Sequence, residues 1–215
     1  MKTAKELFDE LNAQDETTEV EAKGAGPINH SVMESICAFS NEPDLGGGYI
    51  LIGAKRDELE LFPSYTAEDI GDPDKLQSDL ATQCANSFNL PVRPRMVVAQ
   101  VNGVNVLVVK VDELPPGQKP LHFKHVGLPG GAYRRIGPTD HRCTEDDMPL
   151  FYSDRESYDR TVLARTSLQD IDANALGLYR TLRERVNPAA EELAYGDEEL
   201  LLSLGCLDPI GRVNL

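Results

Sequence analysis

Two β-branched runs joined by Asn102 and Gly103 constrain this fold more than any other feature of the sequence. Residues 96–111, MVVAQVNGVNVLVVKV, predict two strands. Asn-Gly favours the tight turn of a β-hairpin, because both residues readily adopt positive φ. Another apolar run, residues 49–52, follows the glycines at 46–48 and predicts a buried strand. The chain is therefore expected to build its core on a β-sheet.

Helical patterns lie between these strands. Apolar residues recur at spacings of three and four in segments 3–13, 30–41 and 72–88, which predicts an amphipathic helix in each. Thr3 suits the N-cap of the first helix, Asn29 or Ser31 that of the second, and Pro73 the first turn of the third. Further short strands are expected at 18–23, 121–124 and 130–137, and a short helix at 143–151. This order predicts an α+β fold with a mixed β-sheet flanked by helices.

The composition changes after about residue 152, where a polar and charged stretch begins. Helical patterns return at 168–186, 189–194 and 197–204, followed by a turn at 208–211. We therefore expect one domain at 1–152, followed by a small helical extension at 153–215 that serves as a connector or as part of a winged-helix-like unit. The sequence stops where a strand begins, which indicates a fragment of a longer protein.

Composition excludes several classes of protein. The sequence has no apolar run of membrane-spanning length, and its first residues lack the apolar core of a signal peptide. Its four cysteines are widely spaced without a CxxC pair, which indicates reduced thiols in a cytoplasmic protein. His122 and His125 have no cysteine nearby and lack the spacing of helical zinc ligands, so a zinc site is not expected.

The distribution of charge is uneven. The chain carries a net charge of −15, yet residues 86–142 hold 8 bases and 3 acids. A nucleic-acid site needs a local positive surface and not a positive total, so this basic island is compatible with such a site. Taken alone, the same count also fits bases that are scattered and solvated.

One cluster of carboxylates precedes and occupies the first expected strand. Glu19, Glu21 and Lys23 alternate and would point to one face, and Glu16 could swing onto the same face. Asp57, just after the buried strand, could supply a third carboxylate. Neighbouring carboxylates bind Mg²⁺ or Mn²⁺, which phosphodiesterases use to activate water. The alternative is an ordinary exposed face of charged residues.

A second cluster lies in residues 131–142. Arg134 and Arg135 would point to opposite faces of a strand, with Tyr133 beside them and Arg142 further along. Arginine and tyrosine together offer phosphate contacts and base stacking. The alternative is that these arginines pair with the many acids of this chain.

Several motifs in this order resemble the Schlafen AlbA-type domain, over about residues 3–152. The family opens with a Glu-Ser-x-x-x-Glu-Phe-Lys-like motif, which residues 16–23 match with Ala22 in place of the aromatic. Ile-x-Ala-Phe-Ala-Asn corresponds to residues 36–41, Gly-Gly-x-Leu-x-Ile-Gly-Val to 47–54, Pro-x-Tyr to 120–123, and Ala-Tyr-x-Arg-x-Gly-Ser-x-Thr to 132–139. The family is found at the front of bacterial transcriptional regulators, where it is described as DNA-binding, and in animal Schlafens.

The resemblance also implies a chemistry. Animal Schlafens cleave transfer and ribosomal RNA with three carboxylates, of which the first two correspond to Glu16 and Glu21. The third normally belongs to an acidic pair after the buried strand. Here that stretch is Lys55-Arg56-Asp57, so a base replaces one acid and Asp57 is matched to the third carboxylate.

Three functions are therefore expected of the chain. The first is a module of a bacterial regulator that binds DNA or RNA on a basic face comprising Lys23, Lys55, Arg56, Arg134, Arg135 and Arg142. The second is a metal-dependent endoribonuclease in which Glu16, Glu21 and Asp57 hold Mg²⁺ or Mn²⁺. The third is an interaction module that forms homo-oligomers within a larger regulator.

Overall fold

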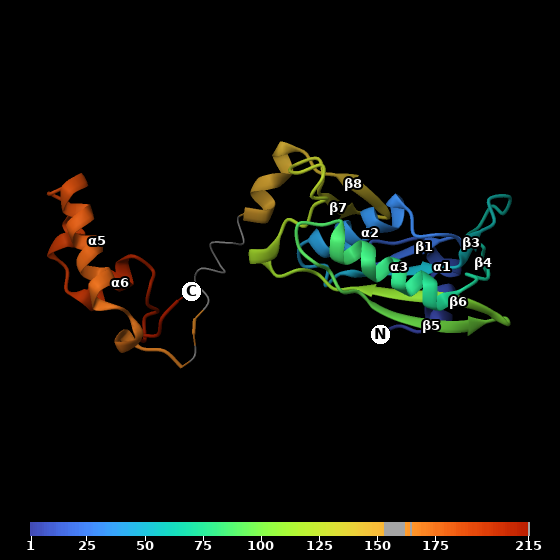
Figure 1. Cartoon of the computed structure of the whole chain (residues 1–215), viewed down its shortest axis with the longest axis horizontal. Helices are drawn as coiled ribbons and strands as arrows, with labels where there is room; N and C mark the ends of the chain where they lie inside the picture. The colour runs from blue at the N-terminus through green and yellow to red at the C-terminus, as the bar shows by residue number, and fades with distance from the viewer. Residues whose placement is uncertain (153–161, 164, 215) are drawn as a thin grey trace. The chain divides into compact units, whose positions relative to one another are not determined.

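The computed structural model describes residues 1–152, 162–163 and 165–214 (Figure 1). The polar stretch predicted after residue 152 lies mostly outside these residues. The chain divides into two compact units, Met1–Phe151 (unit 1) and Tyr152–Leu215 (unit 2). None of the described helices is both long enough and apolar enough to cross a membrane.

The core of unit 1 is a four-stranded mixed sheet, which confirms the predicted α+β class. Its strands are β1 (Val20–Lys23), β2 (Gly48–Ile52), β6 (Val104–Val111) and β5 (Arg95–Val101), in that spatial order. β1 pairs with β2 in parallel, and the other neighbours are antiparallel. Asn102 and Gly103 form the predicted turn between β5 and β6, with φ of 52° and 84°.

Helices cover both faces of this sheet, because side chains alternate along its buried strands. α1 (Ala4–Gln14) packs Leu7 and Leu11 on the face that carries Leu51 and Val108. α2 (His30–Asn41) and α3 (Pro73–Asn86) pack on the opposite face, which carries Ile50, Ile52, Leu107 and Val109. The three predicted helices are thus confirmed.

Two small antiparallel hairpins extend unit 1. The first joins β3 (Ala54–Arg56) to β4 (Tyr65–Ala67), and was not predicted. The second joins β7 (Tyr133–Ile136) to β8 (Thr139–Arg142). The predicted helix at 143–151 begins as a 3₁₀ turn, Glu145–Asp147.

The strand predicted at 121–124 is wrong. Phe123 makes only an isolated bridge to Phe88. The Leu121 N–H donates to Asn41 Oδ1 at 2.6 Å, and the Leu121 carbonyl accepts from Asn41 Nδ2 at 2.8 Å. The Asn41 side chain therefore forms the hydrogen bonds with the Leu121 backbone that a neighbouring strand would otherwise form.

Unit 2 is helical, as predicted. It contains α5 (Ala173–Val186), α6 (Asp197–Ser203) and the 3₁₀ turns Leu168–Asp170 and Glu191–Ala194. Leu200, Leu201 and Leu207 are its most buried leucines, and Leu207 makes an isolated β-bridge with Val213.

Candidate functional site

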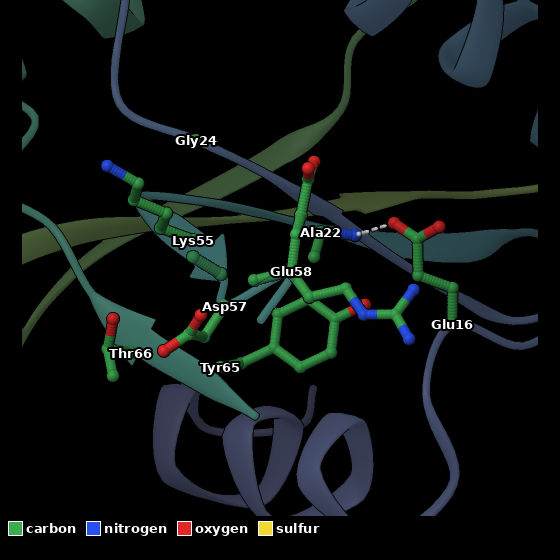
Figure 2. Close-up of a pocket in the computed structure, with 10 residues that line it drawn as sticks. Glu16, Ala22, Gly24, Lys55, Asp57, Glu58, Tyr65 and Thr66 are labelled. Atoms are coloured by element: carbon green, nitrogen blue, oxygen red, sulfur yellow. Dashed lines mark hydrogen bonds between the residues drawn. The ribbon is translucent and has the colours of Figure 1, made fainter. Parts of the chain in front are cut away.

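A pocket of about 750 Å³ opens in unit 1 where β1 and β2 end (Figure 2). Because the two strands are parallel, their carboxyl ends bring Gly24 and Ala54 to the same edge of the sheet, a common place for ligand sites. The residues that line it come from the α1–β1 connection, the end of β1 and the β3–β4 hairpin: Glu16, Ala22, Gly24, Ala54, Lys55, Arg56, Asp57, Glu58, Tyr65 and Thr66.

Gly53 creates the bend that positions the hairpin over the pocket. Its φ is 92°, and a Cβ at this position would lie 2.7 Å from the Glu68 carbonyl oxygen. Its N–H donates to the Lys23 carbonyl at 2.8 Å, which ties the bend to the end of β1. Glycine is therefore required here, and the bend carries Lys55 and Arg56 onto a separate two-stranded arm.

The two cations of this arm lie in different surroundings. The Lys55 side chain is 66% exposed, and its Nζ is 3.9 Å from Glu68 Oε1, too far for a hydrogen bond. Arg56 Nη2 is 2.8 Å from Asp15 Oδ2 in a half-exposed ion pair. Asp15 also accepts a hydrogen bond from the Tyr65 hydroxyl. Lys55 is thus the more available donor for an anionic ligand.

Two of the three predicted carboxylates line this pocket. Glu16 Oε1 accepts from the Ala22 N–H at 2.9 Å, and burial together with the charge of Glu21 raises the Glu16 pKa. Asp57 is exposed, and its Oδ1 accepts from the Leu59 N–H at 3.0 Å. Figure 2 shows Glu16 and Asp57 on opposite sides of the view. The same pocket has a third carboxylate, Glu58, which was not predicted.

Glu21 lies elsewhere, in the interior. Its Oε1 accepts from Lys23 Nζ at 2.6 Å, and its Oε2 is 2.6 Å from Arg135 Nη1. The described residues contain no group of three or more histidine, cysteine, aspartate or glutamate side chains placed to hold a metal ion. Lys23 and Arg135 thus already neutralise Glu21, and a Mg²⁺ or Mn²⁺ ion shared by Glu16, Glu21 and Asp57 stays a prediction.

Arg135 is inaccessible to any phosphate. Its side chain has 0% exposure, pairs with Glu21 and Asp140, and donates to the Thr17 carbonyl at 2.8 Å. Its guanidinium also lies 4.9 Å from the centre of the Phe39 ring. The phosphate contact predicted for Arg135 is thus replaced by internal contacts that join β7 to β1 and α2.

Arg134 is also paired with carboxylates of the same unit. It donates two hydrogen bonds to Glu42 and one to Asp147, and these bonds raise its pKa. Lys23 is half-buried, and its ammonium donates hydrogen bonds to Glu21 Oε1 and to Ser31 Oγ, each at 2.6 Å. Arg142 is exposed, and its Nε donates to the Gly130 carbonyl at 2.6 Å. Of the six predicted cations, the structure brings only Lys55 and Arg56 to the pocket.

The pocket also contains residues that the sequence analysis missed. Tyr65 and Thr66 reach it from β4, which is only three residues long and shows no alternation. Gly24 also lines the pocket. The one sequence signal for Gly24 is its place directly after Lys23 at the end of the first strand.

Comparison with known proteins identifies relatives of both units. The sequence model of the Schlafen AlbA_2 family matches residues 16–144, and that of a domain of unknown function (DUF8451) matches residues 150–211. No curated protein matches the chain.

Two solved structures are similar. One is the solution NMR structure of the N-terminal domain of a RecG-related protein from Nitrosomonas europaea, with 48% identity over 67% of this chain and 95% of that chain and a TM-score of 0.56. The other is the DIP2311 protein from Corynebacterium diphtheriae, with 20% identity over 92% of this chain and 34% of that chain and a TM-score of 0.45.

Proposed function

This chain belongs to the Schlafen AlbA_2 family, and from that membership we propose that unit 1 binds nucleic acid at the pocket where β1 and β2 end. The relative at 48% identity supports a role near DNA, because its name refers to an ATP-dependent DNA helicase. We further propose that the domain serves as the nucleic-acid-binding module of a larger bacterial regulator.

The observation that carries the proposal is the position of Lys55. Its ammonium lies at the pocket rim, largely exposed, with its nearest carboxylate beyond hydrogen-bond distance. An ammonium in this position can donate hydrogen bonds to a phosphate without first breaking an internal hydrogen bond. Lys55 thus contributes a phosphate contact at little cost in lost protein contacts.

Arg56 adds a second contact on the same arm. Its ion pair with Asp15 is half-exposed, and such pairs stabilise folded proteins by only about 0.2–1 kcal/mol. A phosphate can therefore replace Asp15 as the partner of the Arg56 guanidinium with only a small loss of stability. The Thr66 hydroxyl and the backbone at Gly24 offer further polar groups along the wall.

The acids of the pocket limit the strength of this binding. Glu16, Asp57 and Glu58 share the wall with the two cations, so the local charge is mixed. The proposal is therefore weak, salt-sensitive binding with little sequence selectivity, because phosphate contacts carry no base information. A ligand that presents phosphates only to the rim avoids Glu16, which lies against Ala22.

Binding of a fluorescein-labelled 12-nucleotide single strand, measured by anisotropy from low to moderate salt, tests the proposal. Lys55→Ala should weaken binding and make the slope of log K against log salt shallower by about one unit. Lys75→Ala is the matched control, because Lys75 is an exposed lysine on α3 outside the pocket. Equal affinities and slopes for the wild-type protein and Lys55→Ala would refute this site.

A further inference from the structure

A second surface of unit 1 gathers aromatic rings and cations around Phe123. The Phe123 ring centre lies 4.8 Å from that of His30 and 5.8 Å from that of His125. Phe123 is buried, whereas the His30 side chain is 59% exposed and His125 is also exposed. The two imidazoles are therefore the part of this aromatic group that solvent reaches.

Two exposed cations come from the segments that carry this aromatic group. Lys124 follows Phe123 and is exposed, and Arg142 is exposed at the end of β8. Arg142 donates to the Gly130 carbonyl and interacts with the Tyr133 hydroxyl, which belongs to the same aromatic group. Among the residues that the structure describes, no carboxylate lies within 4.0 Å of either cation.

Within the described part of the chain, Glu34 is the one carboxylate that forms an ion pair with this group. Glu34 Oε1 lies 3.4 Å from His30 Nε2, and burial together with the neighbouring Glu34 raises the pKa of the Tyr133 hydroxyl. We name the combination of His30, Lys124, His125 and Arg142 the Phe123 surface. Its cations are less neutralised than those of the pocket, where three carboxylates share the wall.

We propose that the Phe123 surface binds unpaired nucleotides of a single-stranded nucleic acid, an inference that rests on the proposed function and specifies its ligand. Exposed imidazole rings offer stacking platforms for bases, and neighbouring cations hold the phosphates between them. A duplex hides the faces of its bases, so it can use the cations but not the rings. The surface therefore selects single strands over duplexes.

The chain connects this surface to the pocket. His30 is the first residue of α2, and the neighbouring Ser31 Oγ accepts from Lys23 Nζ at 2.6 Å. Lys23 ends β1, and the next residue, Gly24, lines the pocket. A strand held at Lys55 can thus continue past Lys23 and the start of α2 to reach the Phe123 surface.

The test measures anisotropy of a 12-nucleotide single strand and of a duplex of the same sequence with the full chain at one pH and salt concentration. His125→Ala should weaken single-strand binding about fivefold or more, as expected for loss of one stacked base, and leave duplex binding unchanged. Lys124→Ala should weaken binding of both ligands. His141→Ala and Lys75→Ala are the matched controls, because both residues are exposed and lie outside the two surfaces.

The outcomes separate this inference from the proposed function. If Lys55→Ala weakens binding while His125→Ala changes neither ligand, the pocket stands and the Phe123 surface is refuted. Equal losses for single strand and duplex in His125→Ala would also refute it, since stacking requires unpaired bases. A third measurement adds adenosine monophosphate as a competitor. If it displaces the single strand at a similar molar concentration of nucleotide, the surface binds mononucleotides and the proposed single-stranded ligand is wrong.

Discussion

Arg135 Nη1 lies 2.6 Å from Glu21 Oε2 inside unit 1, where the two side chains are 0% and 8% exposed. From sequence alone, Arg135 is predicted to contact a phosphate and Glu21 to bind a metal ion. In the fold they neutralise each other, and Asp140 and Lys23 complete the network. Residues that looked like a functional site thus join β1 to β7.

Arg135→Ala should destabilise unit 1 by about 3–5 kcal/mol, because it leaves the buried Glu21 with Lys23 alone and Asp140 without its guanidinium partner. Urea unfolding followed by circular dichroism measures the change. Arg95→Ala is the control: its ion pair with Asp112 is 60% exposed on both sides, so a loss of at most about 1 kcal/mol is expected. Similar small losses in both variants would contradict an internal role for Arg135.

Asn41→Ala should cost at least about 2 kcal/mol. The amide of Asn41 bonds to both the N–H and the carbonyl of Leu121 and to the carbonyl of Tyr133, and all of these bonds are buried. A buried polar group that is left without a hydrogen-bond partner lowers the free energy of unfolding by about 1–3 kcal/mol. The control is Asn86→Ala, whose exposed bond to the Thr82 carbonyl should change stability by less than about 0.5 kcal/mol.

Glu16→Gln should stabilise the protein at pH 7 and lose that advantage in acid. Burial and the charge of Glu21 raise the folded-state pKa of Glu16 above its unfolded value. Protonation therefore favours the folded state: the contribution is complete below the unfolded pKa of about 4.3 and is lost as pH rises through the folded pKa. The glutamine amide keeps an oxygen to accept from Ala22 without a charge.

The difference in unfolding free energy between Glu16→Gln and the wild-type protein, followed from pH 7.5 down to pH 4, checks this expectation. It should shrink towards zero as the pH falls. A difference that stays constant with pH, or that grows in acid, would show that the carboxylate of Glu16 is not disfavoured by its surroundings.

Removal of divalent cations should leave nucleic-acid binding unchanged. The proposed pocket contacts are lysine and arginine side chains, and Glu21 is already paired with Lys23 and Arg135. Anisotropy titrations with EDTA and with Mn²⁺ should therefore give the same dissociation constant within about a factor of two. Manganese-dependent cleavage of transfer RNA that Glu21→Ala abolishes would instead support the endoribonuclease alternative.

Local signals explain why most of the fold could be predicted. The Asn102–Gly103 turn, the Thr3 cap and the apolar periodicity of α2 each act within a few residues, and the structure reproduces all three. The resemblance to the family also placed Asn41 in a motif, and the structure gives the physical reason in its three buried hydrogen bonds.

The site could be predicted only in part, because burial depends on contacts between distant segments. Alternation placed Arg134 and Arg135 on opposite faces of a strand but could not show that Arg135 meets Glu21, more than 100 positions away in sequence. The β3–β4 hairpin was missed because three-residue strands carry no alternation and the bend depends on the positive φ of Gly53. The pocket walls from that hairpin were missed with it.

The most direct test of the central claim is a titration of the ¹⁵N-labelled chain with a 12-nucleotide single strand, followed residue by residue through amide chemical shifts. Binding at the pocket predicts saturable shifts at Gly24, at Lys55 and its neighbours, and at Thr66, with the same dissociation constant at each. Saturable shifts confined to other parts of the chain, or no shifts at low salt, would contradict the assignment of this pocket to nucleic acid.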